Sequence, residues 1–370
     1  MTPEAVEAYG VRLRPFRPDD AADIAAGCAD PLTQRFLPGL PSPYTEADAR
    51  RWITEGAPAA WATGGAAYAI ADRTTDRLLG TVGLSNPVPV RQQAEIGYWT
   101  APWARGRGVA TAATRALAER AFATGTARLE LLTDPENAAS QRVAMAAGFH
   151  HEGVRRNAGP ARDGGRRDSI AWVRLADDPP GPAPRLLPDL PGGRLTDGVV
   201  TLRPLGPVDV DLMYGLHTRP EVVASRVPPE PPARQVVEQH CRQAMSRWLS
   251  GQAANLVILD AASGDAAGTC VLMYDEPATR QAMVGYSLLP DWRGRGYATR
   301  TVRLLANWGF ADVGLERIWA GTHVGNTASE RVLERAGFRR EGRERGRLPG
   351  VDGTRADTTL FGLLPGDLEG

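Results

Sequence analysis

The chain has 370 residues, and its 43 basic and 43 acidic side chains give a formal net charge of zero at neutral pH. This length exceeds that of an average domain and favours two domains, each with its own core. The balanced charge, without a long basic run, argues against nucleic acid or an anionic membrane as the main partner. Every basic residue is arginine, so no lysine is available for Schiff-base chemistry.

The three cysteines, Cys28, Cys241 and Cys270, are widely spaced and form no C-x-x-C pattern. We therefore expect unpaired thiols in a reducing compartment, with neither a metal site nor a disulfide framework. No window reaches the length of a membrane span, and the first residues lack the pattern of a secretory leader. The sequence predicts a soluble, cytoplasmic protein.

The first half of the chain alternates between strand and helix patterns. Alternating apolar residues at 11–16 predict a strand, and helical segments such as 46–56 follow it. Residues 68–85 have the pattern of a hairpin turned at 73–77. The order indicates a mixed α/β unit.

A strand at 94–99 then runs through a glycine-rich turn into a helix expected at about 108–124. A strand at 127–134 and a short helix at 138–148 come next, before two late strands. The centre of the unit is therefore a strand, a turn and a helix.

The second half repeats four blocks of the first half in the same order. The pairs are 11–24 with 200–213, 80–84 with 268–272, 96–111 with 284–299, and 137–149 with 326–338. A nearly constant offset indicates a duplicated domain. We expect domains at 1–175 and 199–370, joined by a linker at 176–198 that is rich in proline and glycine.

The glycine-rich turn recurs at the start of a helix in both halves. The first N–H groups of a helix have no partner within it, and the helix dipole makes this end mildly positive. Glycines 106 and 108 leave room for a phosphate to approach these N–H groups. A dinucleotide-binding turn is excluded because the third glycine is missing, and a P-loop is excluded because there is no lysine.

The two turns, "RGRGVA" and "RGRGYA", resemble the (Q/R)-x-x-G-x-(G/A) acyl-CoA pyrophosphate loop of the GNAT superfamily of N-acyltransferases. The segments "NAASQRVAMAAGF" and "NTASERVLERAGF" resemble the N-x-x-S…GF segment of the branch with ribosomal-protein N-terminal acetyltransferases. The resemblance implies an α+β fold of two tandem GNAT domains. Each would be a mixed, twisted β-sheet flanked by helices, in which two central parallel strands splay apart.

The resemblance also implies one acetyl-CoA, or another acyl-CoA, in each half, and no metal. The residues that it assigns to this ligand are Arg105, Gly106, Arg107, Gly108, Val109, Ala110 and Thr111 in the first half and Arg293, Gly294, Arg295, Gly296, Tyr297, Ala298 and Thr299 in the second. The splayed strands would end near Trp99 and Asp134, and near Leu288 and His323.

An amine must lose a proton before it attacks a thioester. Glu95 stands where many family members carry a glutamate as the base, although it could equally be an exposed glutamate paired with Arg91. The second half has Met283 at this position, so that half is either silent or uses another base. His323, which aligns with Asp134, is the candidate base, and its alternative role is structural.

The departing thiolate needs a proton or a hydrogen bond. Many family members use a tyrosine seven residues after the asparagine, but those positions are Ala144 and Leu333 here. The candidates that replace it are Ser140 and Ser329, which lie three residues, about one helical turn, after Asn137 and Asn326. Alternatively, these serines and asparagines only cap helices and turns.

The leading hypothesis is an acyl-CoA-dependent N-acyltransferase acting on an amine of a small molecule or peptide, as a monomer with paired domains or as a homodimer. Two alternatives are a non-catalytic acyl-CoA sensor or scaffold, and a transferase whose acyl donor is bound to a carrier protein. The variable segments 28–45 and 217–232 would shape the acceptor site.

Overall fold

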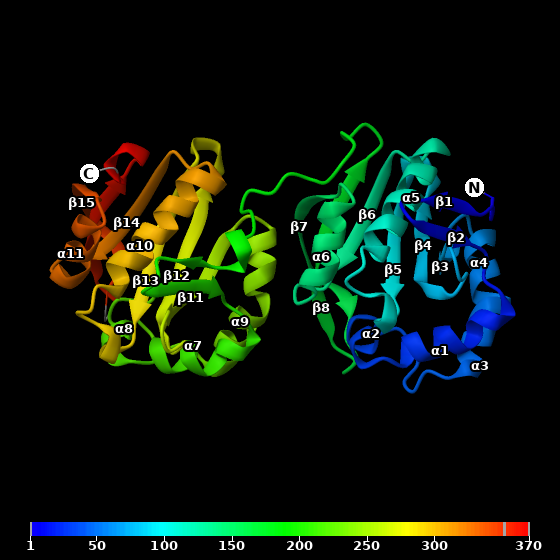
Figure 1. Cartoon of the computed structure of the whole chain (residues 1–370), viewed down its shortest axis with the longest axis horizontal. Coiled ribbons are helices and arrows are strands. Elements are labelled where there is room, and N and C mark those ends of the chain that lie inside the picture. Colours follow the sequence, from blue (N-terminus) through cyan, green and yellow to red (C-terminus); the bar gives the residue numbers. More distant parts are fainter. Residues whose placement is uncertain (1, 351–352, 369–370) are drawn as a thin grey trace. The chain divides into compact units, whose positions relative to one another are not determined.

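The computed structural model describes residues 2–350 and 353–368. The chain divides into two compact units, Met1–Pro184 and Arg185–Gly370 (Figure 1). Each unit contains one eight-stranded mixed sheet, and the spatial order of the strands is the same in both. The predicted pair of α+β domains is confirmed.

The first sheet has the order β1-β2-β3-β4-β5-β6-β8-β7. Its strands are β1 (Val6–Ala8), β2 (Val11–Arg14), β3 (Ala66–Asp72), β4 (Leu78–Val88), β5 (Gln93–Thr100), β6 (Arg128–Thr133), β7 (His150–Pro160) and β8 (Arg166–Leu175). Its helices are α1 (Ala21–Ala29), α2 (Pro31–Phe36), α3 (Glu46–Arg51), α4 (Ala57–Ala62), α5 (Val109–Ala123) and α6 (Ala138–Ala146). The predicted hairpin is formed by β3 and β4, which pair antiparallel.

The second sheet has the order β15-β16-β14-β13-β12-β11-β10-β9. Its strands are β9 (Leu195–Thr196), β10 (Val200–Pro204), β11 (Ala253–Asp260), β12 (Ala266–Glu276), β13 (Gln281–Leu288), β14 (Arg317–His323), β15 (Arg339–Pro349) and β16 (Arg355–Leu363). Its helices are α7 (Val210–His217), α8 (Pro220–Val223), α9 (Arg234–Leu249), α10 (Tyr297–Trp308) and α11 (Thr327–Arg335).

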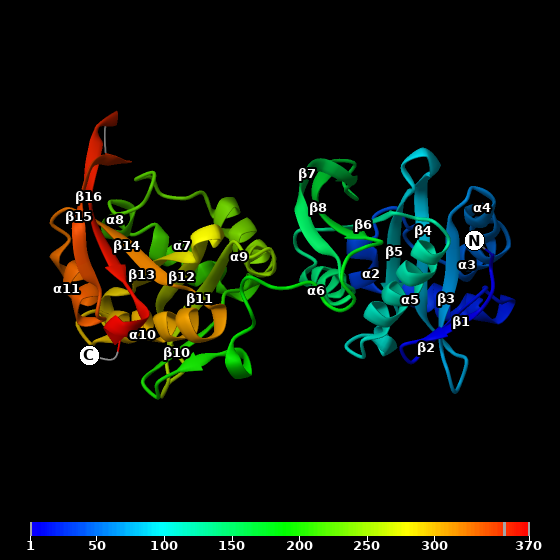
Figure 2. The ribbon, with the colours of Figure 1, turned by 90° about the horizontal axis from the view of Figure 1, so that it is seen from above.

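Helices cover both faces of each sheet. Adjacent strand residues point to opposite faces, and on β5 the Tyr98 hydroxyl contacts Ser140 of α6, whereas the Trp99 ring lies against Gly27 of α1. Figure 2 shows the same arrangement in the second unit, with α10 on one side of the sheet and α7 and α9 on the other. Two layers of helices therefore enclose each sheet.

The central parallel strands separate partway along their length. β5 pairs with β6 only from Gln93 to Glu95, although both strands continue beyond these residues. In the second unit β13 pairs with β14 only from Gln281 to Met283. The predicted splay is confirmed, and it leaves backbone N–H and C=O groups on β5 and β13 without a partner strand on that side.

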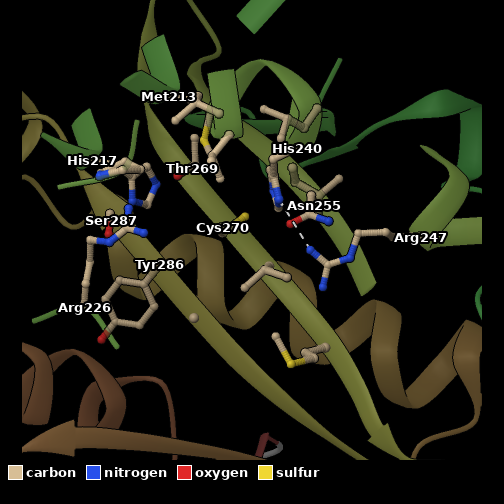
Figure 3. A pocket seen from close by; sticks show the side chains of 18 of the residues that line it. Met213, His217, Arg226, His240, Arg247, Asn255, Thr269, Cys270, Tyr286 and Ser287 are labelled. Atoms are coloured by element: carbon tan, nitrogen blue, oxygen red, sulfur yellow. Dashed lines mark hydrogen bonds between the residues drawn. The ribbon is translucent and has the colours of Figure 1, made fainter. Parts of the chain in front are cut away.

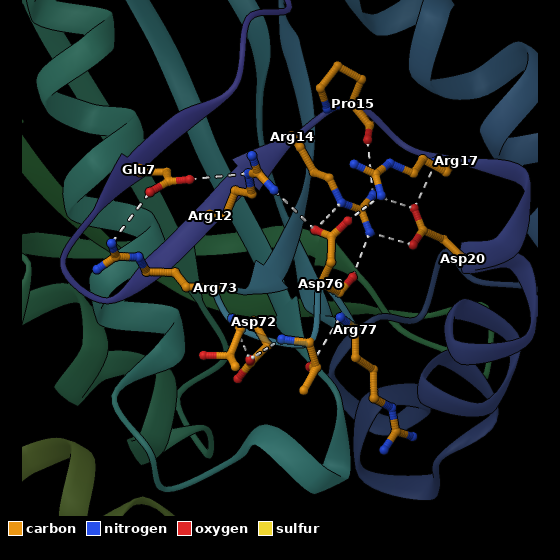
Figure 4. Close-up of polar contacts among 12 residues, drawn as sticks. Glu7, Arg12, Arg14, Pro15, Arg17, Asp20, Asp72, Arg73, Asp76 and Arg77 are labelled. Carbon is orange, nitrogen blue, oxygen red and sulfur yellow. Dashed lines mark hydrogen bonds and ion pairs between the residues drawn. The ribbon is translucent and has the colours of Figure 1, made fainter.

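A buried ion pair fixes the start of the first unit (Figure 4). Arg14, which is 3% exposed, donates to both carboxylate oxygens of Asp20 at 2.8 and 2.9 Å and, through Nε, to Asp76 at 3.0 Å. This joins β2 to the N-terminus of α1 and to the β3–β4 turn. The corresponding Arg203 and Asp209 pair in the same bidentate way, but the Arg203 side chain is 35% exposed.

The helix predicted at 46–56 extends further than expected. α3 continues through a π-helical turn, η2 (Trp52–Gly56), into α4. Pro58 has no N–H to donate to Thr54, and the N–H of Ala57 donates instead to Trp52 five residues earlier. The helical segment therefore ends at Ala62.

Part of the segment expected as an open linker, 176–198, is packed. Leu187 and Leu190 are buried in the core of the second unit, and the carbonyl of Pro188 accepts a hydrogen bond from the Trp248 indole at 3.0 Å. β9 pairs with β10. Its leucines bury apolar surface, which the composition did not predict.

Candidate functional site

The turn between β5 and α5 has the geometry of an anion cradle. Gly106 and Gly108 have φ angles of 72° and 74°, in the left-handed region that favours glycine. Gly108 precedes the first turn of α5, and its carbonyl accepts from the N–H of Ala112. The preceding N–H groups, those of Val109 to Thr111, have no acceptor within the helix.

The second unit repeats this turn before α10. Gly294 and Gly296 have φ angles of 73° and 83°, and the carbonyl of Gly296 accepts from Arg300. A Cβ added at either glycine, or at Gly106 or Gly108, would meet no atom within 4 Å. Because nothing fills this space, a phosphate can reach the N-terminus of either helix.

The arginines of the first turn contact protein groups. Arg105 donates to Asp30 and to the Thr33 hydroxyl, which joins the turn to α2. Arg107 lies 3.8 Å from Asp72. The positive charge beside the first turn is therefore partly balanced by carboxylates.

In the second turn, Arg293 donates to the carbonyl of Leu288 and to Glu221, and Arg295 stacks over Trp292. The Tyr297 hydroxyl donates to Asp260, and the ring is buried. The Tyr297 side chain therefore points into the protein. The group of Tyr297 that can contact a ligand is its backbone N–H.

A cleft of about 630 Å³ opens between the splayed strands of the first unit, and we call it the β5–β6 cleft. Glu95, the glycine turn, Asn137 and Ser140 all line it. Its lining residues come from α2, β5, the turn, α5, β6 and α6. The structure thus brings together the residues expected in the first half, except Arg107, which lies outside the lining.

A second cavity of about 320 Å³ lies on the α1 side of the same sheet, and we call it the α1-side pocket. Its lining is apolar and aromatic, and includes Phe16, Leu37 and Trp52. It shares Leu37 and the strand residues Gly97, Tyr98 and Trp99 with the β5–β6 cleft. Two cavities with different linings therefore meet at one short stretch of β5.

A tyrosine and a serine form a pair at this meeting point that the sequence analysis missed. The Tyr98 hydroxyl lies 2.8 Å from Ser140 Oγ, and the Tyr286 hydroxyl lies 2.8 Å from Ser329 Oγ. Burial raises the pKa of both phenols, that of Tyr286 to about 12. Both hydroxyls therefore keep their proton at neutral pH.

The asparagines, not these serines, cap the helices. Asn137 Oδ1 accepts from the N–H of Ser140 at 3.1 Å, and Asn326 Oδ1 accepts from the N–H of Ser329 at 3.2 Å. Each asparagine is the N-cap of α6 or α11. The serine hydroxyl is thereby left to face the tyrosine.

Glu95 lies on β5 where the pairing with β6 ends. Its Oε2 accepts from the Asn86 side chain at 3.1 Å, so the partner is Asn86 and not Arg91. Met283 holds the matching register position on β13, opposite Trp319 of β14. The carboxylate of the first unit thus has a thioether in its place in the second.

His323 is the last residue of β14, and within the described chain its Nε2 is buried without a hydrogen-bond partner. A pocket of about 380 Å³ in the second unit, which we call the α7-side pocket, is lined by two other histidines, His217 and His240, and not by His323. It also contains Tyr286. The structure therefore places these other imidazoles, and not the expected one, in a pocket that reaches the tyrosine.

Comparison with known proteins identifies the fold. The acetyltransferase (GNAT) domain matches residues 11–150 and, a second time, residues 200–339. The chain belongs to the GNAT acetyltransferase family. Both copies include the splayed strands and the glycine turn, which confirms the family resemblance of the sequence.

Among GNAT relatives, YjcK of Bacillus subtilis (strain 168), named a probable N-acetyltransferase, is 37% identical over 92 residues, or 25% of this chain and 50% of that protein. YdaF of the same organism, whose name places it among ribosomal N-acetyltransferases, is 33% identical over 107 residues, or 29% of this chain and 58% of YdaF. The chain thus spans about half the length of these curated relatives.

Among solved structures, RimJ of Mycobacterium smegmatis in complex with CoA-disulfide is 25% identical and has a TM-score of 0.42. That match covers 48% of this chain and 87% of RimJ.

Across residues 2–350 and 353–368, no group of three or more His, Cys, Asp or Glu side chains could hold a metal ion. Within the same residues, every helix is too short or too polar to span a bilayer.

Proposed function

We propose that this GNAT protein is an N-acyltransferase that takes its acyl group from acetyl-CoA or another acyl-CoA, with one donor site in each unit. The observation that carries the proposal is the meeting of the β5–β6 cleft and the α1-side pocket at Gly97, Tyr98 and Trp99. A transferase needs two substrates whose reacting atoms meet at one point. Two cavities that share a short stretch of strand provide this.

The glycine turns fit the pyrophosphate of a CoA ligand. The N–H groups of Val109 to Thr111 point out of the first turn of α5, and the glycines leave the approach open. The open edge of β5 beyond Glu95 can pair with the amides of an extended arm. Such a ligand supplies a thioester, whose carbonyl carbon is attacked by an amine.

We assign the two proton transfers to two side chains that line the β5–β6 cleft. Glu95 accepts a proton from the attacking amine, directly or through water, so that the C–N bond can form. Tyr98 donates its hydroxyl proton to the departing sulfur as the C–S bond breaks. Ser140 Oγ, 2.8 Å from this hydroxyl, orients it and stabilises the phenolate that remains.

The second unit keeps the hydroxyl pair but not the carboxylate. Tyr286 and Ser329 repeat the 2.8 Å contact, whereas Met283 cannot accept a proton. The proton donor is thus present in both units, and the base differs between them. The acceptor is an amine of a small molecule or a peptide.

Replacing Glu95 with Gln tests the assignment of the base. Turnover of the first unit should fall by about 10² to 10⁴, while CoA binding stays nearly unchanged. The loss should shrink at high pH, where more of the amine is already deprotonated. The measurement is CoA-thiol release with a panel of amines, in a Gly296→Glu background that removes the second donor site.

The control is Glu46→Gln, because Glu46 lies on the exposed surface of α3 and pairs with Arg50 of the same helix. Normal turnover in Glu95→Gln would refute the role of this carboxylate. The absence of both CoA binding and thiol release in the unmodified protein would refute the proposed function.

A further inference from the structure

The α7-side pocket lies between α7, α9 and strands β11 to β13 of the second unit (Figure 3). It reaches Gly285, Tyr286 and Ser287, which align with the three β5 residues where the cavities of the first unit meet. Its volume of about 380 Å³ is within the usual range for a small-molecule site. By position it is the acceptor pocket of the second unit.

Most of the lining of this pocket is apolar, but it also carries two arginines and other hydrogen-bonding groups, and no carboxylate. These groups are His217, Arg226, His240, Arg247 and Asn255. Figure 3 shows His217 beside Arg226, and His240 together with Asn255 and Arg247. In the described parts of the chain, no ion pair neutralises either arginine, and Arg247 contacts His240 Nδ1 at 3.4 Å.

Three nitrogen atoms of the pocket are buried and have no hydrogen-bond partner among the described residues. They are His217 Nε2, Arg226 Nε and Asn255 Nδ2. Asn255 is only 8% exposed, so water does not reach its amide freely. An unpaired buried donor is costly, and a ligand oxygen would satisfy it. Guanidinium and amide N–H groups only donate, so the ligand group they fit is an acceptor with negative charge.

The first unit shows that the fold does not require these groups. Val200 aligns with Val11, which places His217 at the position of Cys28, a buried residue of the α1-side pocket. The strand registers place Asn255 at the position of Ala67. The α1-side pocket contains no charged residue. The two units thus share one architecture, but the pocket of the second unit carries two arginines where that of the first carries no charged residue.

We propose that the second unit acylates an amine that also carries an anionic group, a carboxylate or a phosphate, which the charges of Arg226 and Arg247 attract into the pocket. This inference rests on the proposed function. The anionic group offsets the repulsion between an amine and the two arginines. The same positive charge favours the neutral amine over the ammonium form, and only the neutral amine attacks a thioester. This effect partly replaces the base that the second unit lacks at Met283.

His217 offers the acceptor a neutral hydrogen-bonding ring, and its low pKa makes it a weak base. Burial and the nearby Arg226 and His240 lower the pKa of His217 to about 4, so its ring is neutral at pH 7. Burial and Arg247 also lower the pKa of His240. A neutral imidazole has one nitrogen lone pair, and Nε2 of His217 is unpaired in the pocket.

Turnover tests the inference with matched acceptor pairs in a Gly108→Glu background, which removes the donor site of the first unit. The pairs are lysine with 1,5-diaminopentane, and O-phosphoethanolamine with ethanolamine. In at least one pair, the acceptor with the anionic group should have a kcat/KM about 10- to 100-fold higher than that of its partner. This is the ratio that a hydrogen bond to a charged group supports. Which pair shows the larger ratio distinguishes a carboxylate from a phosphate.

Arg226→Gln and Arg247→Gln should each remove most of this preference, measured as the ratio of kcat/KM within each pair. The matched control is Arg280→Gln, because Arg280 is an exposed arginine of the same unit that pairs with Glu316 outside the pocket. A preference for the acceptors without an anionic group would overturn the inference. So would a preference for the anionic acceptors that survives both pocket variants.

Calorimetry with succinate and with inorganic phosphate, without any acyl donor, separates this inference from the proposed function. One of these anions should bind to the unmodified protein, and Arg226→Gln should abolish the binding. Anion binding without turnover of any amine would support the pocket and refute the transferase. Turnover without anion binding or anionic preference would support the transferase and refute the anionic acceptor.

Discussion

Replacing Tyr98 with Phe removes the proposed proton donor of the first unit and little else. The phenol keeps its proton at neutral pH because burial raises its pKa, and its hydroxyl lies 2.8 Å from Ser140 Oγ. General acid catalysis contributes about 10² to 10⁴ to the rate, so turnover should fall by that factor. The lost hydrogen bond should lower the free energy of unfolding by only about 1 kcal/mol.

The assay is CoA-thiol release in the Gly296→Glu background, with CoA affinity and thermal unfolding measured on the same samples. Because Tyr98 protonates the leaving sulfur, its loss should persist at high pH, unlike the loss in Glu95→Gln. The control is Tyr9→Phe, which likewise deletes a hydrogen-bonded tyrosine hydroxyl. The Tyr9 hydroxyl donates to Glu119 and lies outside both cavities. Unchanged turnover in Tyr98→Phe, or recovery at high pH, would refute the assignment.

Two further predictions concern stability. Arg14→Ala leaves Asp20 buried without its cation and should destabilise the first unit by about 3 to 5 kcal/mol. Arg203→Ala should destabilise the second unit less, because the Arg203 side chain is 35% exposed. Equal losses in chemical unfolding would contradict this. The pKa of His217 lies near 4 in the folded protein, below the value of about 6.5 in the unfolded chain, so the unfolded state binds more protons between these values. The second unit should therefore lose stability as the pH falls from about 6.5 to 4, by up to about 3 kcal/mol for this group, and His217→Gln should reduce the loss in thermal unfolding.

The sequence predicted the features that rest on local pattern. The duplicated blocks, the hairpin and the turn before α5 follow from periodicity and from glycines that the backbone requires at positive φ. The family resemblance predicted the splay of β5 from β6, which register pairing confirms. Each of these features depends on residues close together in the chain or on a motif of known spacing.

The Tyr98–Ser140 pair could not be predicted in this way because it joins two elements 42 residues apart. In the helix after Asn137, the position where many family members carry a tyrosine is the buried Ala144. The hydroxyl comes instead from the neighbouring strand. The signal that could have found it is the "GY" shared by the aligned strands, at Tyr98 and Tyr286.

The basic pocket of the second unit was also missed. His240 and Arg247 are seven residues apart on α9, two helical turns, so they share a face. A helical pattern could have paired them, but their approach to Arg226 and Asn255 depends on how α9 packs on β11. The prediction that residues 217–232 shape the acceptor site stays a prediction, and His217, Arg226 and Val227 of this segment line the pocket.

Calorimetric titration with CoA tests most directly whether each unit holds one acyl-CoA. The unmodified chain should bind two molecules, and Gly108→Glu and Gly296→Glu should each remove one, because a carboxylate would stand where the pyrophosphate binds. Gly125→Glu and Gly314→Glu are matched controls, since these glycines have positive φ and open surroundings at the far ends of α5 and of the helical segment after α10. Both controls should retain two sites. A single site in the unmodified chain, or the same loss in the controls, would contradict this account.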